Sequence, residues 1–391
     1  MSRPQPAAVP NAAMNVGFEV HIMLVSAQAA ANLLPALDPD LKPREAVLLV
    51  SAPMRERADA LERVLQEAKI KTTREQLDNE HDYDALSARL LDLAAGRSDQ
   101  SIALNVTGGT KLMALAAQPI AHEAGWPVFY VDVDTDEVVW IGTKARPPHR
   151  LTEQLRLRHY LAAYGFDSEK RERARPPPGH DDLIKTLLHQ IGSLEAPLAQ
   201  LNWLTQLAQD RRSLSVELDA RQRDSIGLDT LLRNFENAGL LRVEAGRLSF
   251  SDSTSRDYVK GGWLERHVFT TVCRHVEDLG IRDQAANLEI KDRAGLRNEL
   301  DVAFMARNRL FVIECKTARM DRPEAPKAND TLFKLSEVSK RVGGLGTRGL
   351  LASYRPLREP ECRLAQALGI ELACGSELAN LDDRLKRWVR R

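Results

Sequence analysis

The residues best suited to chemistry lie in one stretch near the C-terminus, NELDVAFMARNRLFVIECK, residues 298–316. Two apolar runs with alternating side chains flank the Arg-Asn dipeptide 307–308, a pattern that predicts a β-hairpin turning there. In that register Asp301 lies opposite Glu314, and Lys316 lies on the same face two residues further along. Directly opposed side chains have Cβ atoms about 4.5–5.5 Å apart, so the two carboxylates would repel and desolvate each other.

A divalent cation between the two carboxylates would offset that repulsion. Mg²⁺ or Mn²⁺ is typically held by one or two carboxylates together with water and substrate phosphate. We therefore expect Asp301 and Glu314 to bind Mg²⁺ or Mn²⁺, and Lys316 to orient an attacking water or to stabilise charge on a phosphate. The alternative is a surface hairpin with a cross-strand ion pair between Glu299 and Lys316. The uninterrupted apolar run LFVI before Glu314 favours a buried strand instead.

A second signal is NVTGGTKLMALAA, residues 105–117, which predicts a strand, a glycine-rich turn and a helix. The start of such a helix presents free N–H groups and a positive dipole end, which suit a phosphate-bearing ligand. Neither GxxxxGK[ST] nor GxGxxG is present, so an NTPase or a dinucleotide dehydrogenase is poorly supported. A tight turn without a ligand remains the alternative. The end of the first strand, VSAQAAAN, would border the same crevice. The candidate ligand-binding residues are Ser26, Gln28, Asn32, Asn105, Thr107, Gly108, Gly109, Thr110 and Lys111.

The order of the predicted elements divides the chain into four parts. Residues 1–17 form a Pro/Ala-rich disordered tail, and residues 18–150 alternate strands with helices, which predicts a parallel α/β sheet. Residues 151–260 begin with a linker, because a charge run and three prolines interrupt the periodicity at 165–182. The rest of that part is mostly helical and resembles a winged helix. Residues 261–391 form an α/β or α+β module that contains the acidic hairpin.

The charge balance separates these parts. The whole chain has 55 basic and 55 acidic side chains among 391 residues, which alone argues against a nucleic-acid partner. By segment, residues 1–150 have 15 basic and 20 acidic side chains, whereas residues 261–391 have 24 and 19. The basic surplus thus lies on the module with the hairpin, where a polyanion would dock. The sequence shows no apolar stretch long enough for a membrane span and no CxxC spacing, so we expect a cytoplasmic protein.

The hairpin motif, Asp301-x₁₂-Glu314-Cys315-Lys316, resembles the core of the PD-(D/E)xK, or restriction-endonuclease-like, nucleases. Leu300 stands where the name of that motif has proline. In that family a helix before the hairpin often supplies a further acidic residue. The resemblance therefore implies that Glu265, in GGWLE, joins Asp301, Glu314 and Lys316 as a catalytic residue.

The N-terminal half resembles a CARF domain, the Rossmann-like sensor of CRISPR-associated proteins. With GGWLE, NELDV and IECKT in that order, the chain is similar to CRISPR-associated ancillary nucleases. The resemblance implies a homodimer that binds cyclic tetra-adenylate across its two-fold axis and then cleaves DNA or RNA with a metal ion in type III CRISPR antiviral defence. Two alternatives remain: a ligand-gated transcription regulator that reads DNA with residues 183–250, and a constitutive restriction or repair nuclease.

Overall fold

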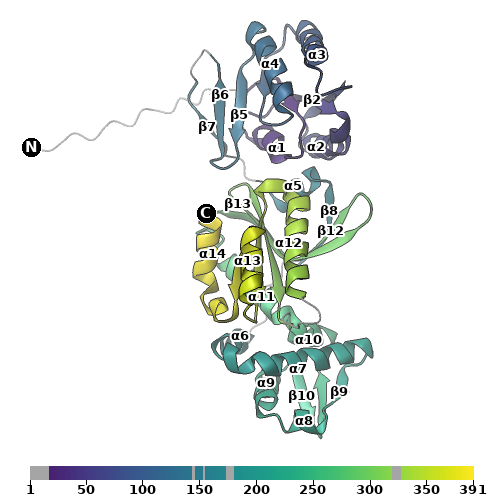
Figure 1. Ribbon diagram of the computed structural model, residues 1–391, viewed down its shortest axis with the longest axis vertical. Helices are drawn as coiled ribbons and strands as arrows, with labels where there is room; N and C mark the ends of the chain where they lie inside the picture. The colour runs from purple at the N-terminus through teal and green to yellow at the C-terminus, as the bar shows by residue number, and fades with distance from the viewer. Residues whose placement is uncertain (1–16, 143–145, 153–154, 173–179, 319–326) are drawn as a thin grey trace, which may run out of the picture. The chain divides into compact units, whose positions relative to one another are not determined.

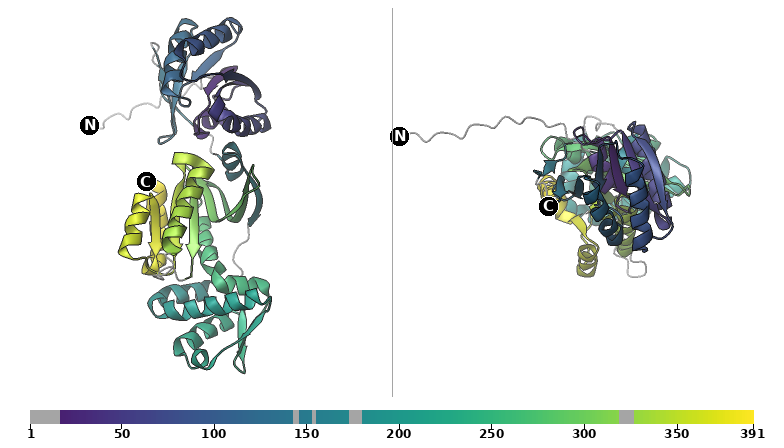
Figure 2. Two further views of the ribbon diagram at one scale, coloured as in Figure 1. Left: turned by 45° about the vertical axis from the view of Figure 1, so that its right-hand side comes forward. Right: turned by 90° about the horizontal axis from the view of Figure 1, so that it is seen from above.

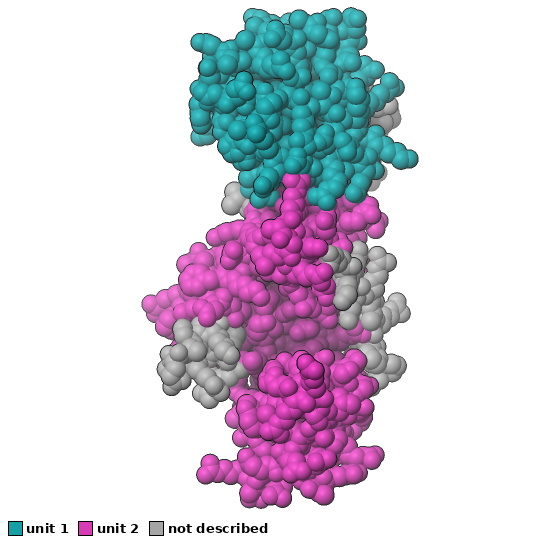
Figure 3. Space-filling view, turned by 90° about the vertical axis from the view of Figure 1, so that its right-hand side faces the viewer, with its two compact units in different colours: residues 1–153 teal, residues 154–391 magenta. Residues whose placement is uncertain are grey.

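The computed structural model describes residues 17–142, 146–152, 155–172, 180–318 and 327–391. The chain divides into two compact units, residues 1–153 and residues 154–391 (Figure 3). Each unit has its own sheet, and the units are described separately below. Within the described ranges, no helix is long and apolar enough to cross a membrane.

Unit 1 is a seven-stranded sheet with the strand order β3-β2-β1-β4-β5-β6-β7 (Figure 1). The first five strands are parallel, and β6 and β7 extend the sheet as antiparallel strands. The order reverses between β1 and β4, so the ligand-binding crevice of such a sheet lies beyond the ends of these two strands. The elements are β1 (Val20–Leu24), α1 (Ala30–Leu37), β2 (Glu45–Ser51), α2 (Arg55–Glu67), β3 (Lys71–Leu77), α3 (Tyr83–Ala95), β4 (Ile102–Asn105), α4 (Lys111–Glu123), β5 (Val128–Asp132), β6 (Glu137–Ile141) and β7 (His149–Arg150).

The predicted parallel sheet is confirmed, with one strand that the sequence pattern did not reveal. Strands β1 and β2 are buried along their whole length, as expected of apolar runs between helices. Strand β3, KTTREQL, lies at the edge of the sheet and is mostly polar and partly exposed. It lacks the apolar alternation on which strand prediction depends.

A buried histidine in β1 makes the stability of unit 1 sensitive to acid. His21 is 0% exposed, with its ring centroid 5.4 Å from that of Phe129. Neither ring nitrogen has a hydrogen-bond partner in the described part of the chain. Burial lowers the pKa of His21 to about 3, so the folded unit excludes a proton that the unfolded chain accepts below pH 6.5.

We predict that the free energy of unfolding of unit 1 falls as the pH drops from about 6.5 toward 3, by at most about 1.4 kcal/mol per pH unit from this group. His21→Leu should weaken this pH dependence, whereas His81→Gln, at an exposed site, should leave it unchanged. Urea unfolding at pH 4.5 and pH 7 measures the effect. An equal pH dependence in wild type and His21→Leu would contradict it.

Unit 2 contains a six-stranded sheet with the order β16-β15-β14-β13-β12-β8. Strands β12, β13 and β14 form an antiparallel meander, and β15 and β16 continue the sheet in parallel with β14. The elements of this module are α5 (Leu157–Ala163), β8 (Phe166–Glu172), α11 (Trp263–Arg274), β12 (Ile281–Asp292), β13 (Arg297–Ala306), β14 (Arg309–Lys316), α12 (Lys327–Gly343), β15 (Arg348–Ser353), α13 (Glu359–Ala367), β16 (Ile370–Cys374) and α14 (Leu381–Arg390).

The winged-helix-like segment is inserted between β8 and α11. Its three-stranded sheet has the order β10-β11-β9, and the turn of the wing at Ala245 and Gly246 has two positive φ angles, which suits a tight hairpin. The elements are α6 (His180–His189), α7 (Ile191–Asp210), β9 (Ser215–Glu217), α8 (Ala220–Arg223), α9 (Ile226–Asn237), β10 (Leu241–Glu244) and β11 (Arg247–Phe250), followed by α10 (Ser253–Asp257) and the π-helix η2 (Tyr258–Gly262).

The interpretation of residues 165–182 as a linker is wrong for its first part. Residues 166–172 form β8, which pairs with β12 at the edge of the nuclease-like sheet. Its sequence, FDSEKRE, is mostly polar, because an edge strand needs few apolar side chains. The composition alone therefore suggested a linker. Residues 173–179, including the three prolines, lie outside the described residues. The domain boundaries at residues 150 and 260 stay predictions.

The winged-helix segment and the module around the six-stranded sheet share one hydrophobic core. A single cluster of buried side chains runs from Leu183 through Leu201 and Phe235 to Trp263, Phe311 and Trp388. Helix α7 lies along the end of the sheet module in both views of unit 2 (Figures 1 and 2). The winged-helix segment is therefore packed as part of unit 2 rather than attached to it by a free linker.

Candidate active site

The hairpin that presents the acidic residues has the predicted turn and register. Arg307 and Asn308 both have positive φ angles, 50° and 55°, as a two-residue type I′ turn requires. Ala306 pairs with Arg309 and the ladder continues to Val302 and Ile313, so Asp301 and Glu314 occupy the next positions.

Beyond this ladder the two strands separate, and the site forms in the gap. The backbone N–H of Cys315 donates to Oδ2 of Asp301 at 2.7 Å, where a ladder bond would otherwise lie. On its other edge β14 stays paired with β15 from Phe311 to Lys316, so only the edge that faces β13 is open here. Asp301 is thereby turned toward the end of β14, next to Glu314 and Lys316.

The ion pair of the alternative surface hairpin, between Glu299 and Lys316, does not form, and Lys316 pairs with Glu314 instead. Glu299 pairs with Glu289 of β12 in the sheet register. Lys316 Nζ lies 2.5 Å from Oε1 of Glu314, and the exposed fractions of the two side chains are 33% and 17%. Glu314 and Lys316, two residues apart on one face of β14, thus contact each other directly. The ladder with β13 has already ended at this point.

The electrostatics of this cluster are those of crowded, half-buried carboxylates. Burial, together with the neighbouring Glu314, raises the pKa of Asp301 to about 7, and Glu265 adds to the increase while Lys316 opposes it. Glu265, in the first turn of α11, is therefore close enough to act on Asp301. The structure brings all four predicted catalytic residues, Asp301, Glu314, Lys316 and Glu265, to one place.

Lys316 remains a cation in this environment. Burial favours its neutral amine, but Glu314 and Asp301 outweigh that effect and raise the pKa of Lys316 above its usual range. A permanently charged ammonium suits a donor to a phosphate or to an attacking water rather than a general base.

The acidic cluster fits a divalent cation. Burial and the neighbouring charge of Glu314 together make the ionised form of Asp301 unfavourable, so its pKa is raised to about 7. A cation between Asp301 and Glu314 would remove that repulsion, and oxygen ligands of this kind suit Mg²⁺ or Mn²⁺. Glu265 acts electrostatically on Asp301 and is the candidate for a further oxygen ligand.

A second group of possible metal ligands lies in unit 1, and hydrogen bonds within the protein explain this group better than a metal ion does. The side chains of Asp38, Asp40 and His149 lie near one another. The carboxylate of Asp38 already accepts hydrogen bonds from the backbone of Asp40 and from the backbone and hydroxyl of Thr152, and it contacts Nε2 of His149 at 3.1 Å. These bonds account for the buried carboxylate, which joins the end of α1 to the β7 region.

In the predicted ligand crevice, three of the candidate side chains form a buried network. Asn32 donates to the carbonyl of Leu24 at 2.9 Å, and Asn105 donates to Ala31 at 2.9 Å and to Oδ1 of Asn32 at 3.0 Å. Thr107 donates through its hydroxyl to Asn105 at 2.6 Å. The network joins the ends of β1 and β4, so these residues shape the crevice; that they contact a ligand stays a prediction.

The other candidates lie just after β1 and at the start of α4. Ser26 accepts a hydrogen bond from the backbone of Gln28, and the Thr110 hydroxyl caps α4 by accepting from Met113. Lys111 is exposed at the first position of α4. The ligand-binding groups that this arrangement favours are therefore the turn's backbone N–H groups together with Lys111.

The two glycines of the turn are required by its packing against β1. A Cβ on Gly108 would lie 2.1 Å from the carbonyl oxygen of Leu24, and Gly109 has a φ of +71°. We predict that Gly108→Ala destabilises unit 1 by about 1–3 kcal/mol, because the turn must move off β1. Thermal unfolding checks this, with Gly96→Ala as the control, since a Cβ there meets only one backbone oxygen at 3.4 Å. Equal melting temperatures for the two variants would refute the prediction.

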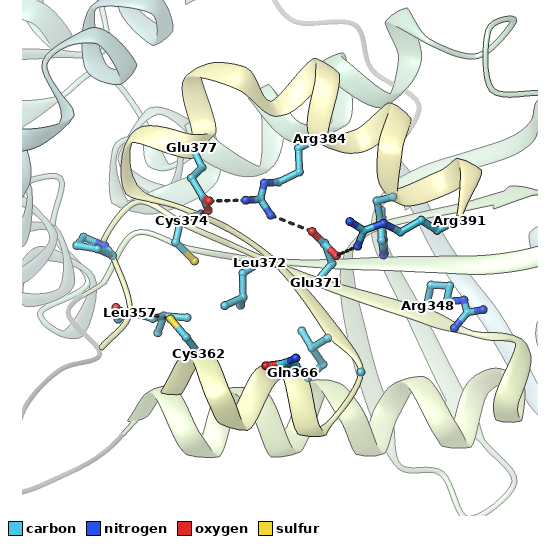
Figure 4. Close-up of a pocket in the computed structure, with 14 residues that line it drawn as sticks. Arg348, Leu357, Cys362, Gln366, Glu371, Leu372, Cys374, Glu377, Arg384 and Arg391 are labelled. Carbon is cyan, nitrogen blue, oxygen red and sulfur yellow. Dashed lines mark hydrogen bonds and ion pairs between the residues drawn. The ribbon is translucent and has the colours of Figure 1, made fainter. Parts of the chain in front are cut away.

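A cavity of about 760 Å³ lies elsewhere in unit 2, between α13, β16 and α14 (Figure 4). Arg384 spans it to reach Glu371 and Glu377, and Arg391 also pairs with Glu371 (Figure 4). None of the predicted catalytic residues lines this cavity. Its lining places three arginines and two glutamates beside the edge strand β16, and charged side chains are a common protection of a sheet edge.

Family models match both ends of the chain. The model of the Card1 CARF domain matches residues 20–160, and the model of the Card1-like endonuclease domain matches residues 252–391. The chain belongs to the CRISPR-associated ancillary nucleases that join a CARF domain to an endonuclease domain. The sequence-based resemblance and the mixed α/β fold class are confirmed. None of the curated proteins matches the chain.

Solved structures of similar proteins cover the whole fold. Protein VC1899 of Vibrio cholerae has a TM-score of 0.85 at 25% identity, and the match covers 96% of this chain and 98% of that one. Can2 from Sulfobacillus thermosulfidooxidans, solved in complex with cyclic tetra-adenylate, has a TM-score of 0.79 at 25% identity over the same shares. A type III CRISPR defence DNA nuclease activated by cyclic oligoadenylate is similar in fold only, at 18% identity and a TM-score of 0.57, over 99% of this chain and 52% of that one.

Proposed function

We propose that the protein is a metal-dependent endonuclease that cyclic oligoadenylate, cyclic tetra-adenylate in particular, activates for cleavage of DNA or RNA in type III CRISPR antiviral defence. The observation that supports it most is the convergence of Asp301, Glu314 and Glu265 beside the ammonium of Lys316. A divalent cation bound there would act as a Lewis acid toward the scissile phosphate and would lower the pKa of a bound water. The carboxylates hold it, and Lys316 donates to the phosphate or positions the water.

The sensor half of the proposal depends on the crevice beyond β1 and β4. Ser26, Gln28 and Lys111 would contact the ligand from opposite sides, with the backbone of the TGGTK turn between them. A cyclic activator with two-fold symmetry suits a homodimer, because each protomer then supplies the same half-site. We accordingly propose a cytoplasmic homodimer as the active form. That Can2 was solved with cyclic tetra-adenylate supports this choice of ligand.

The test is cleavage of plasmid DNA and of single-stranded DNA and RNA with Mg²⁺ or Mn²⁺, with and without cyclic tetra-adenylate. We expect cleavage only when metal and ligand are both present, and its loss in Asp301→Ala and in Lys316→Ala. Cleavage by either variant at the wild-type rate would overturn the assignment of the site. Full activity without ligand would instead favour a constitutive nuclease.

The charge of the winged-helix segment disfavours the transcription regulator. Residues 180–257 have nine basic and twelve acidic side chains. On α9, which would be the reading helix of a winged-helix protein, Arg233 pairs with Asp229 at 2.7 Å. In the wing, Arg247 pairs with Glu217 at 3.1 Å. The acidic surplus of this segment therefore opposes its docking on the phosphate backbone.

A further inference from the structure

Helix α7 of the winged-helix segment contacts three parts of the nuclease site from one of its faces. The contacts come from Glu195, Asn202 and Gln209, which are spaced seven residues apart and therefore lie on one face of the helix. The three contacting residues are polar, whereas most of the α7 residues that face the core are apolar. Each of the three residues holds a different element of the module that contains Asp301.

The first and third contacts fix the elements on either side of the catalytic strand. The buried Arg355, two residues after β15, donates to the carbonyl of Glu195 at 2.7 Å and pairs with its carboxylate at 3.0 Å. Lys260, in the π-helix that leads into α11, donates to Oε1 of Gln209 at 2.7 Å. Helix α11 is the element that presents Glu265.

The central contact holds the residue that follows Lys316. Nδ2 of Asn202 lies 3.2 Å from both the carbonyl oxygen and the hydroxyl oxygen of Thr317. The same hydroxyl donates to the carbonyl of Lys260 at 3.0 Å. Thr317 is 6% exposed, and a Cβ on Gly261 would lie 3.0 Å from its hydroxyl oxygen, so the Thr317 side chain packs closely against the backbone of Gly261.

We propose that Asn202 is a positioning residue of the nuclease site, which acts through Thr317 to fix the end of β14 relative to α11. Lys316 and Glu314 belong to β14, and Glu265 belongs to α11. The distance between these side chains therefore depends on the hydrogen bonds at Thr317. The proposal assigns the winged-helix segment a structural role in the nuclease site instead of a role in reading DNA, and it rests on the proposed nuclease function.

The hydrogen bonds of Asn202 favour a positioning role over a purely stabilising one. Its Oδ1 is buried and has no hydrogen-bond partner within the described residues. An unpaired buried acceptor costs free energy, so an amide is a poor choice for stability alone at this position. Replacement of Asn202 by alanine removes the unpaired oxygen together with the two contacts, and should therefore change activity more than stability.

The experiment compares Asn202→Ala with Gln200→Ala, an exposed position on the same helix, in the full-length protein. We expect the kcat of Asn202→Ala to fall about 10- to 100-fold, with KM for the nucleic acid within about twofold of wild type. The Mn²⁺ dissociation constant, measured by calorimetry, should rise, and Gln200→Ala should behave as wild type. Thr317→Val should reproduce the defect, and Thr317→Ser, which keeps the hydroxyl, should restore activity.

Each outcome bears on the proposal. Asn202→Ala and Thr317→Val with a kcat and a Mn²⁺ affinity within twofold of wild type would overturn it. So would an equal loss in Gln200→Ala, or a Thr317→Ser variant as impaired as Thr317→Val, because either result indicates general softening of the fold. A wild-type protein that cleaves no substrate would refute the nuclease function instead, and the Mn²⁺ affinities would still test the positioning role.

Discussion

Replacing Asp301 by asparagine is expected to abolish cleavage and, at the same time, to raise the melting temperature of the metal-free protein at pH 8. The loss of activity follows from the loss of a metal-binding oxygen, and should reach at least about a thousandfold for a site of this kind. The gain in stability follows from the pKa of about 7 at Asp301, which shows that the folded protein disfavours the charged carboxylate.

The sign of the stability change depends on pH. The carboxyl of an unfolded chain ionises near pH 3.9, whereas burial and Glu314 delay ionisation in the folded protein. The contribution of Asp301 to the free energy of unfolding is therefore fully present below pH 4. It is lost as the pH rises toward 7, by up to about 4 kcal/mol. The asparagine variant escapes this loss, so its melting temperature should exceed that of wild type by several degrees at pH 8 and by little at pH 4.

Differential scanning calorimetry in the presence of a chelator measures this effect. Asp292→Asn is a suitable control, since Asp292 lies outside the cluster and pairs with Arg341; it should lower stability or leave it unchanged. A melting temperature of Asp301→Asn at or below that of wild type at pH 8 would show that Asp301 is not under electrostatic repulsion in the folded protein.

The second large effect is the competition between protons and metal at the same carboxylates. Because Asp301 retains its proton up to a pH of about 7, a metal ion must displace that proton to bind. We predict that the half-saturating Mn²⁺ concentration falls about tenfold for each pH unit between 5 and 7, and levels off above pH 7. Calorimetry at constant ionic strength measures it, and a half-saturating concentration that is constant from pH 5 to pH 7 would contradict the prediction.

Sequence reasoning predicted the acidic hairpin and its register because their signals are local. Side-chain alternation and the turn at residues 307–308 determine which residues face each other, so the opposition of Asp301 and Glu314 followed directly. The contact from Cys315 to Asp301 did not follow, because it depends on where the ladder between β13 and β14 ends. Strand separation is a tertiary effect that the pattern of one hairpin does not contain.

Other features were not predicted because a polar residue can occur in an edge strand, in a buried hydrogen-bond network or on a solvated face. Strand β8 was interpreted as a linker, since an edge strand needs few apolar side chains. The hydrogen bonds that Asn32 and Asn105 make to each other and to the backbone were not predicted, and their contact with a ligand stays a prediction. The face of α7 formed by residues 195, 202 and 209 gives no signal of its own, because in a sequence it is indistinguishable from a solvated face.

We propose that the carboxylates beside Lys316 form one divalent-metal site. Calorimetric titration of the full-length protein with Mn²⁺ is the decisive experiment, because it does not depend on the choice of nucleic acid or on the activator. We predict one high-affinity site per chain in the wild type and its loss in Asp301→Asn, with cyclic tetra-adenylate binding unchanged. Wild-type Mn²⁺ binding by Asp301→Asn would contradict the claim and place the metal, and with it the chemistry, elsewhere in the chain.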